Sequence, residues 1–259
     1  MATLPFDTPK GLLFDLDGVL YVGDEPIEGA RETIGWIKAK GIPARFLTNT
    51  TTRSLATLYE KLQRLELPIE LDEVFSPPRI AAEWLRKKGS PSVLLVLNDD
   101  TRHEFDEFTE DPDKPDYLVL GDNGNNWDYL LLNRLFNLLL EGSEMLALHK
   151  GKMWKTEQGM RMDIGAFVTG LEYTSGKKAT VIGKPEKPFF ELAIASMKLS
   201  PSDTVMIGDD INNDIRGAKA VGARAILVRT GKYREELVKR AAVQPDLVID
   251  SVADLKELL

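Results

Sequence analysis

The sequence predicts an α/β protein whose parallel sheet is interrupted by a second, inserted α/β unit. Short apolar runs alternate with segments of helical periodicity, a pattern typical of strands that helices cover on both faces. Four of these runs end in polar motifs, and 136 residues separate the second motif at Thr48 from the third at Lys184. One strand–helix–strand unit needs only about 30 residues. We therefore expect a core formed by residues 1–77 and 179–259, and an inserted unit formed by residues 78–178.

The composition is that of an ordinary folded protein and argues against several classes of function. The chain has 259 residues, 43% of them apolar, and it contains no cysteine, which excludes disulfides, thiol catalysis and cysteine-bound zinc. Its formal net charge of −8 argues against nucleic acid as a partner. No apolar run reaches the roughly 20 residues that span a bilayer, and the first ten residues lack the pattern of a secretion signal. We expect a cytoplasmic protein that binds neither nucleic acid nor a membrane.

The first predicted strand lies within Gly11–Leu20, an apolar run that ends in two carboxylates and a glycine. Because side chains alternate along a strand, Asp15 and Asp17 are expected to share a direction while Leu16 points back to the core. Gly18 permits a tight turn and the close approach of a ligand. The carboxyl ends of strands in open α/β sheets are where ligands bind.

The chain then alternates between helix and strand. Apolar residues at helical spacing predict a helix over 27–40, and the apolar run 42–47 predicts a strand that ends in Thr48–Asn49. A second helix is expected over 54–67, with Thr52 or Ser54 as its N-cap.

The inserted unit has its own pattern of strands and helices. Pro77–Pro78 and Ser175–Gly176 are interpreted as its linkers. Within it we expect strands at 93–97, 117–120 and 145–148, helices at 127–140 and 166–173, and a hairpin at 153–162 with Gln158–Gly159 at its centre.

The first pattern resumes after the inserted unit. A strand at 179–183 is expected to end in Lys184, and a strand at 204–208 to end in Asp209, Asp210 and Asp214. The remaining predicted elements are helices at 189–199 and 215–220 and strands at 225–228 and 247–249. Because parallel strands share one edge of a sheet, all four polar motifs are expected to meet there.

The residue types at this edge indicate phosphoryl chemistry with a hard cation. Crowded carboxylates repel each other, and ligands that offer only oxygen suit Mg²⁺ better than zinc. With Mg²⁺ and Lys184 present, Asp15 is a plausible nucleophile toward phosphorus. Asp17 is placed to protonate the leaving oxygen and to deprotonate water. Thr48 and Asn49, with nearby backbone amides, would bind the phosphoryl oxygens.

The four motifs, in this order, resemble those of the haloacid dehalogenase (HAD) superfamily. They read Asp15-Leu16-Asp17-Gly18, Leu47-Thr48-Asn49, Lys184-Pro185 and Gly208-Asp209-Asp210-x-x-x-Asp214. The resemblance covers nearly the whole chain, and the long insert is similar to the C2-type caps of the NagD-like and p-nitrophenyl phosphatases. It implies a Rossmann-like core with an α/β cap over the active site.

The resemblance also implies a role for each matching residue. Asp15 would be nucleophile and metal ligand, and Asp17 the acid and base whose backbone carbonyl also binds Mg²⁺. Asp209 would be the third protein ligand, while Asp210 and Asp214 would support the metal indirectly. The backbone around Gly18 and Thr50 would help to bind phosphate. The aspartate two residues after the nucleophile matches phosphatases rather than true dehalogenases.

Several features allow more than one interpretation. Each motif alone could be a turn or a helix cap, and His103 and His149 are interpreted as surface or loop residues. The apolar stripe at 127–140 indicates cap core or a dimer face, and a homodimer through the cap is what the resemblance implies. His149 and Lys150 stand where related caps face the active site, so a role in specificity is a hypothesis.

The predicted function is a Mg²⁺-dependent phosphatase acting on a small phosphorylated metabolite. The substrate would be a phosphate monoester, or alternatively a pyrophosphate or a phosphoramidate. One alternative is a phosphotransferase or phosphomutase, which would pass the phosphoryl group to an organic acceptor. The other is a non-catalytic phospho-acceptor protein of the receiver type, which also groups aspartates and a lysine at a sheet edge.

Overall fold

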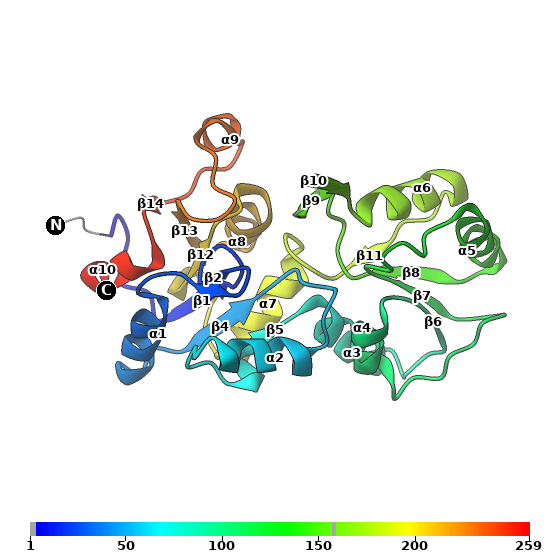
Figure 1. Cartoon of the computed structure of the whole chain (residues 1–259), viewed down its shortest axis with the longest axis horizontal. Helices are drawn as coiled ribbons and strands as arrows, with labels where there is room; N and C mark the ends of the chain where they lie inside the picture. Colours follow the sequence, from blue (N-terminus) through cyan, green and yellow to red (C-terminus); the bar gives the residue numbers. More distant parts are fainter. Residues whose placement is uncertain (1–3, 157–158) are drawn as a thin grey trace. The chain divides into compact units, whose positions relative to one another are not determined.

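The computed structural model describes residues 4–156 and 159–259 (Figure 1). The chain forms two compact units. The first contains the residues up to Thr48, Leu58–Phe75 and Lys184–Leu259, and the second contains Asn49–Thr57 and Ser76–Gly183. In the described part of the chain, no helix has both the length and the apolar character that a membrane span requires.

A six-stranded sheet forms the centre of the first unit, and all of its strand pairs are parallel. The strand order is β14-β13-β12-β1-β4-β5. The strands are β1 (Gly11–Asp15), β4 (Ala44–Leu47), β5 (Val74–Phe75), β12 (Thr204–Gly208), β13 (Arg224–Val228) and β14 (Leu247–Ile249).

The central position of β1 follows from its composition. All five of its residues are buried, and a strand covered on both faces needs such a continuous apolar run. On one face, Phe14 stacks on Phe46 of the neighbouring β4, with ring centroids 5.7 Å apart. The flanking β12 is equally buried, so the two strands that carry acidic residues at their ends lie side by side.

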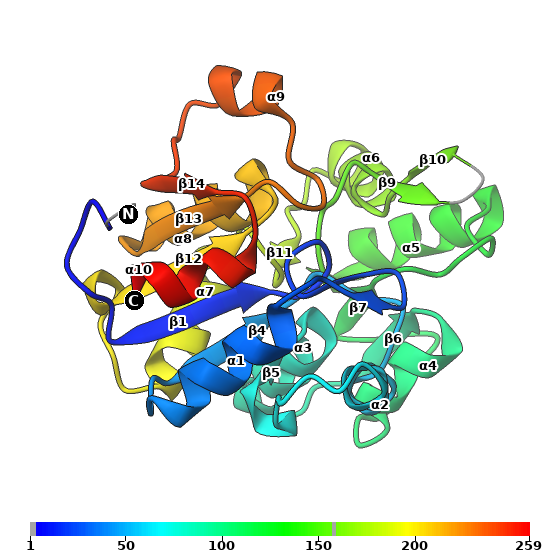
Figure 2. The same cartoon turned by 60° about the vertical axis from the view of Figure 1, so that its left-hand side comes forward.

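Helices cover both faces of this sheet (Figure 2). α1 (Ala30–Ala39) packs with α10 (Leu255–Leu258), and α7 (Lys187–Ser196) packs with α8 (Arg216–Val221). Shorter elements complete the unit: the hairpin of β2 (Tyr21–Val22) and β3 (Glu25–Pro26), α9 (Glu235–Arg240), the 3₁₀ turns η1 (Leu71–Glu73), η3 (Pro201–Asp203) and η5 (Val252–Asp254), and the π-helical turn η4 (Ile211–Ile215).

Helix α2 (Leu55–Arg64) belongs to both units. Its first three residues pack with the second unit, and the rest, from Leu58 onward, pack with the first. The hydroxyl of Ser54 accepts a hydrogen bond from the N–H of Thr57 at 3.2 Å, which is the geometry of an N-cap. Of the two residues expected as the N-cap, Thr52 and Ser54, Ser54 therefore makes the capping hydrogen bond.

The second unit has a four-stranded parallel sheet of its own, in the order β11-β8-β7-β6. The strands are β6 (Val93–Val96), β7 (Tyr117–Leu120), β8 (Glu144–Ala147) and β11 (Thr180–Val181). The other elements are α3 (Pro77–Lys87), α4 (Asp99–Arg102), the 3₁₀ turn η2 (His103–Phe105), α5 (Tyr129–Glu141), α6 (Gly165–Ser175) and the antiparallel hairpin of β9 (Met153–Thr156) and β10 (Gly159–Met162).

The predicted α/β class with an inserted α/β unit is confirmed by the two parallel sheets. Most predicted elements are present within a few residues. Gln158, at the centre of the expected hairpin, lies outside the described residues. The helices and strands that the sequence did not predict are β2, β3, β5, α3, α4, α9 and α10, and apart from the 11-residue α3 they are short.

Three expectations about the strands and linkers were wrong. The strand before Lys184 is β11, which pairs with β8 in the second unit and not with the six-stranded sheet. Its two residues are too few for periodicity to assign it to a sheet. Pro77 and Pro78 form the first turn of α3 rather than a linker, because proline fits the first positions of a helix. Strand β1 ends at Asp15, so Asp17 is not on the strand.

Candidate active site

Three buried carboxylates meet at the carboxyl end of the six-stranded sheet. Asp15 ends β1, Asp209 follows β12, and Asp214 lies in the π-helical turn η4. One oxygen of each lies within 4.8 Å of the others. Because β1 and β12 are parallel neighbours, their carboxyl ends necessarily come together at this edge. We call these three residues the acidic cluster.

Lys184 supplies a positive charge to the acidic cluster. Its Nζ lies 2.7 Å from Oδ1 of Asp15 and 2.7 Å from Oδ1 of Asp214, and it also donates to the carbonyl of Leu47 at 3.3 Å. Burial alone would lower the pKa of Lys184, but the charges of Asp15 and Asp214 outweigh burial and raise it. Lys184 is therefore held as a cation.

The acidic cluster keeps an excess of negative charge despite this lysine. Two carboxylates at this separation repel by roughly 3 kcal/mol at an effective dielectric constant near 20. Burial, followed by the charge of Asp15, raises the pKa of Asp209 to about 8 and that of Asp214 to about 7. The cluster either takes up protons or binds a further cation.

The donor atoms fit a divalent metal ion. In the described part of the chain, Oδ1 of Asp209 is buried without a hydrogen-bond partner, whereas its Oδ2 accepts the N–H of Lys232 at 2.7 Å. A buried oxygen without a partner carries a desolvation penalty unless a ligand binds it. An all-carboxylate set of oxygen donors is suited to a hard cation. The acidic cluster can therefore hold a metal ion.

Two glycines leave room for the side chain of Asp209. A Cβ atom on Gly18 or on Gly231 would lie 2.1 Å from Oδ2 of Asp209, and both residues have a positive φ, of 89° and 63°. Only glycine combines this backbone conformation with so close an approach. The Thr230 hydroxyl donates to the carbonyl of Gly18, which joins the two glycine segments.

The loop of Thr230, Gly231 and Lys232 is a part of the site that the motif argument did not include. Its sequence signal was a glycine three residues after the predicted strand 225–228. Nζ of Lys232 lies 3.9 Å from Asp210. Burial opposes the charged form of Lys232, yet Asp15 and the acidic residues after β12 raise its pKa. Lys232 is thus a second cation of the site, more exposed than Lys184.

Asp17 lies beside the acidic cluster and outside it. The strand ends at Asp15, two residues earlier than expected, where the N–H of Leu16 donates to Oδ1 of Asp15 at 2.8 Å. Asp17 then forms an isolated bridge with Tyr21. Its side chain reaches the surface, but partial desolvation and the charge of Asp15 raise its pKa.

The other predicted residues of the core unit have structural contacts. Asp210 caps η4, since its carboxylate accepts hydrogen bonds from the backbone N–H groups of Asn212 and Asn213. Thr48 is buried just after β4, and its N–H donates to the carbonyl of Phe75 at 3.0 Å. A predicted metal-supporting role for Asp210 and a phosphate-binding role for Thr48 stay predictions.

The remaining predicted residues belong to the second unit: Asn49, Thr50, His149 and Lys150. His149 lies in a loop but is buried, where its Nδ1 accepts the N–H of Gly151 at 3.1 Å. Lys150 donates to Oε2 of the buried Glu172 at 2.6 Å. The amine of Lys150 therefore already has an anionic partner within its own unit.

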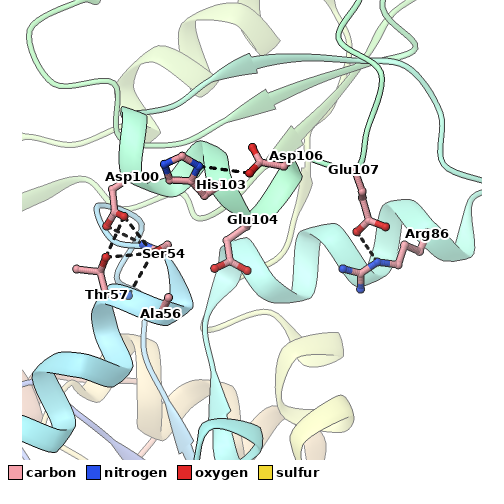
Figure 3. Close-up of a pocket in the computed structure, with 9 residues that line it drawn as sticks. All are labelled: Ser54, Ala56, Thr57, Arg86, Asp100, His103, Glu104, Asp106 and Glu107. Carbon is pink, nitrogen blue, oxygen red and sulfur yellow. Dashed lines mark hydrogen bonds and ion pairs between the residues drawn. The ribbon is translucent and has the colours of Figure 1, made fainter.

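A pocket of about 560 Å³ also lies in the second unit, next to the start of α2 (Figure 3). Its polar groups largely satisfy one another. Asp100 accepts hydrogen bonds from Ser54 and Thr57, and Arg86 pairs with Glu107 at 2.6 Å. None of the residues predicted from the motifs lines it.

Comparison with known proteins gives matches along nearly the whole chain. Residues 12–109 match a family model described as haloacid dehalogenase-like hydrolase, and residues 181–255 match one described as HAD-hydrolase-like. The human haloacid dehalogenase-like hydrolase domain-containing protein 2 is 39% identical, over 93% of this chain and 92% of its own. The human phospholysine phosphohistidine inorganic pyrophosphate phosphatase is 36% identical, over 96% of this chain and 94% of its own.

Solved structures match in fold as well. The p-nitrophenyl phosphatase from Archaeoglobus fulgidus superposes with a TM-score of 0.91 at 26% identity, over 98% of this chain and 100% of its own. The 4-nitrophenylphosphatase from Thermotoga maritima gives a TM-score of 0.89 at 25% identity, over 96% of this chain and 97% of its own. Sequence and fold therefore point to the same group of enzymes.

Proposed function

The chain belongs to the haloacid dehalogenase-like hydrolases, in the branch of the NagD-like and p-nitrophenyl phosphatases, and from this membership we propose a Mg²⁺-dependent phosphatase that acts through an aspartyl-phosphate on Asp15. The observation that carries the proposal is the acidic cluster with Lys184 at one sheet edge. Asp15, Asp209 and the backbone carbonyl of Asp17 would hold Mg²⁺. The ion would neutralise charge on the phosphoryl group.

In the first step, a carboxylate oxygen of Asp15 attacks phosphorus and the bond to the leaving oxygen breaks. Lys184, which donates to Oδ1 of Asp15 at 2.7 Å, orients this carboxylate and offsets the charge of the incoming phosphoryl group. Asp17 gives its proton to the leaving oxygen, so the alcohol departs neutral. Thr48 and Asn49, with the backbone near Gly18 and Thr50, would bind the phosphoryl oxygens.

In the second step, Asp17 takes a proton from water, and the resulting hydroxide attacks the phosphorus of the aspartyl-phosphate. The bond between phosphorus and Asp15 breaks, which releases inorganic phosphate and restores the carboxylate. Splitting one displacement into two gives each a lower barrier. Asp210 and Asp214 would act on the metal indirectly, Asp214 through its pair with Lys184.

The substrate class is a small phosphorylated metabolite. One relative is named for phospholysine, phosphohistidine and inorganic pyrophosphate, and two similar structures are named as nitrophenyl phosphatases. We therefore include monoesters, pyrophosphate and phosphoramidates. The inserted unit would serve as the cap, with residues 78–178 as its extent, His149 and Lys150 as specificity residues, and a homodimer formed through it.

The proposed function is tested with p-nitrophenyl phosphate as the probe. We expect release of inorganic phosphate with Mg²⁺, loss of activity with a chelator, and a fall of at least about a thousandfold in kcat for Asp15→Asn, which removes the nucleophile. Asp203→Asn is the matched control, because Asp203 forms a surface pair with Lys10. An Asp15→Asn enzyme with full activity would rule out the mechanism.

Product analysis separates the alternatives. A phosphatase releases inorganic phosphate from one substrate without an acceptor, whereas a phosphotransferase or mutase needs an organic acceptor. A receiver-type protein would show negligible turnover and a long-lived phosphate on Asp15.

A role for Lys150 in specificity predicts that Lys150→Ala reorders a panel of phosphate esters. Glu172→Gln is the control, because it breaks the same ion pair but keeps the lysine. An unchanged rank order for Lys150→Ala would remove this role.

A further inference from the structure

Lys61 is a buried lysine that lies outside the acidic cluster. It belongs to the part of α2 that packs with the first unit, between the buried Leu58 and Leu62. Its side chain is only 10% exposed. Lysine is seldom so buried unless its amine has partners, and the partners of Lys61 identify what the residue holds.

In the described part of the chain, the amine of Lys61 makes its close contacts with the hairpin of β2 and β3. Burial and the charge of Asp15 raise the pKa of Asp17, and the charge of Lys61 acts to lower it. Nζ donates to the carbonyl of Gly23 at 2.6 Å, lies 3.3 Å from Oδ1 of Asp24, and lies 4.3 Å from the ring centroid of Tyr21. The Asp24 side chain is 84% exposed, so this ion pair adds little. The carbonyl and the ring face therefore carry most of the anchoring.

The hairpin is also the support of the loop that follows β1. The carbonyl of Tyr21 accepts the N–H of Gly18 at 2.7 Å, and Tyr21 forms the bridge with Asp17. Gly18 in turn lies against Asp209. The hairpin strands have two residues each, and so short a hairpin is not stable on its own in water. Its position depends on an anchor.

We propose that Lys61 is a positioning residue for the phosphatase reaction: by fixing the β2–β3 hairpin to α2, it holds the loop that places Asp17 and Gly18 beside the acidic cluster. This inference rests on the proposed function, in which Asp17 transfers protons. A displacement of a reacting group by about 1 Å can lower a rate by about a hundredfold. Loss of the anchor would therefore lower kcat without any loss of a group that touches substrate.

The test compares Lys61→Met with Lys61→Arg in the full chain, with p-nitrophenyl phosphate and Mg²⁺. We expect Lys61→Met to lower kcat by about ten- to a hundredfold with KM within about twofold, and Lys61→Arg to restore most of kcat. Hydrogen exchange of the amides at 18–27 should quicken in Lys61→Met, while exchange in β1 and β12 stays unchanged. Lys40→Met is the control, since exposed Lys40 merely lies 5.6 Å from the Trp36 ring centroid.

Two results would overturn the inference. One is a Lys61→Met enzyme with normal kcat and normal exchange at 18–27. The other is a merely structural role, shown by faster exchange throughout the first unit or by a chain that folds only with lysine or arginine at position 61. If Lys61→Met does not fold, Lys61→Gln is tested in its place. Because exchange does not depend on activity, failure of the proposed function, seen as an active Asp15→Asn enzyme, is distinguishable from failure of the anchor.

Discussion

The balance of charge around Lys184 governs the core of the site at the scale of single residues. One lysine, 2% exposed, contacts two of the three buried carboxylates. Removing one partner from such a group is strongly destabilising, because it leaves the other charges buried without compensation. The lysine is therefore needed for the fold of this edge of the sheet.

Lys184→Met should abolish phosphatase activity and lower the free energy of unfolding by about 3–5 kcal/mol at pH 8. The loss should be smaller at pH 6, because Asp209 and Asp214, with their raised pKa values, then carry protons in place of the lost charge. Urea denaturation at the two pH values measures both effects. Lys10→Met, at an exposed surface pair, is the control, and equal stability of Lys184→Met and the unchanged chain would contradict the prediction.

The sequence allowed the three residues of the acidic cluster and Lys184 to be predicted to lie together, and for Asp15 and Asp209 the reason is their place at the ends of strands. Asp15 and Asp209 directly follow or end apolar runs, so a parallel sheet brings them together whatever the rest of the chain does. Gly231, Lys232 and Lys61 were not predicted as site residues. Gly231 contributes by lacking a side chain, and Lys232 donates to Asp209 through its backbone N–H, which any residue has. Lys61 lies within a predicted helix, where a lysine is ordinarily exposed.

At the scale of elements, α5 shows two faces that composition alone could not separate. Its run of leucines predicts either a cap core or a dimer face. Leu135, Leu138 and Leu139 are buried in the core of the second unit, whereas Tyr129 and Leu130 are each 77% exposed. The core face is thus confirmed. The exposed face is compatible with a dimer, which stays a prediction.

Alanine substitutions on the two faces of α5 should differ in their effect. Leu135→Ala should lower the free energy of unfolding by about 2–5 kcal/mol, because it leaves a cavity among packed side chains. Leu130→Ala should change it by less than about 0.5 kcal/mol. Urea denaturation followed by circular dichroism measures both. A large loss for Leu130→Ala would indicate that its face is covered in solution.

The case of β11 shows why sheet membership was harder to predict than strand location. The apolar run before Lys184 was correctly interpreted as a strand. Its two ladder residues pair with β8, and nothing in so short a run distinguishes that sheet from the other one. Partner choice depends on packing of distant residues, whereas strand location depends on local pattern.

The whole molecule should lose stability with rising pH when no metal is bound. In the folded chain the pKa values of Asp209 and Asp214 lie at about 8 and about 7, above the ordinary value of 3.8. The folded state therefore keeps protons that the unfolded state has released. This contribution is fully present below the ordinary pKa of 3.8, decreases as pH rises above it, and is lost once pH has risen through 7 to 8. Each group contributes at most about 1.4 kcal/mol per pH unit.

Thermal unfolding of chelator-treated protein measures this effect. We expect a lower Tm at pH 8.5 than at pH 6, and a larger increase in Tm on addition of Mg²⁺ at the higher pH. Asp209→Asn should flatten the dependence, because an amide does not titrate. A Tm that is independent of pH in this range, with and without Mg²⁺, would contradict the prediction.

The central position of β1 has a consequence for synthesis. Of its two hydrogen-bonded neighbours, β4 follows closely in the chain, but β12 begins only at Thr204. Asp15 and its partner Lys184 are 169 residues apart. On the ribosome, this apolar strand therefore keeps one open edge until the last quarter of the chain emerges, and open strand edges invite aggregation. Chains released before Thr204 should thus be substrates for chaperones and proteases.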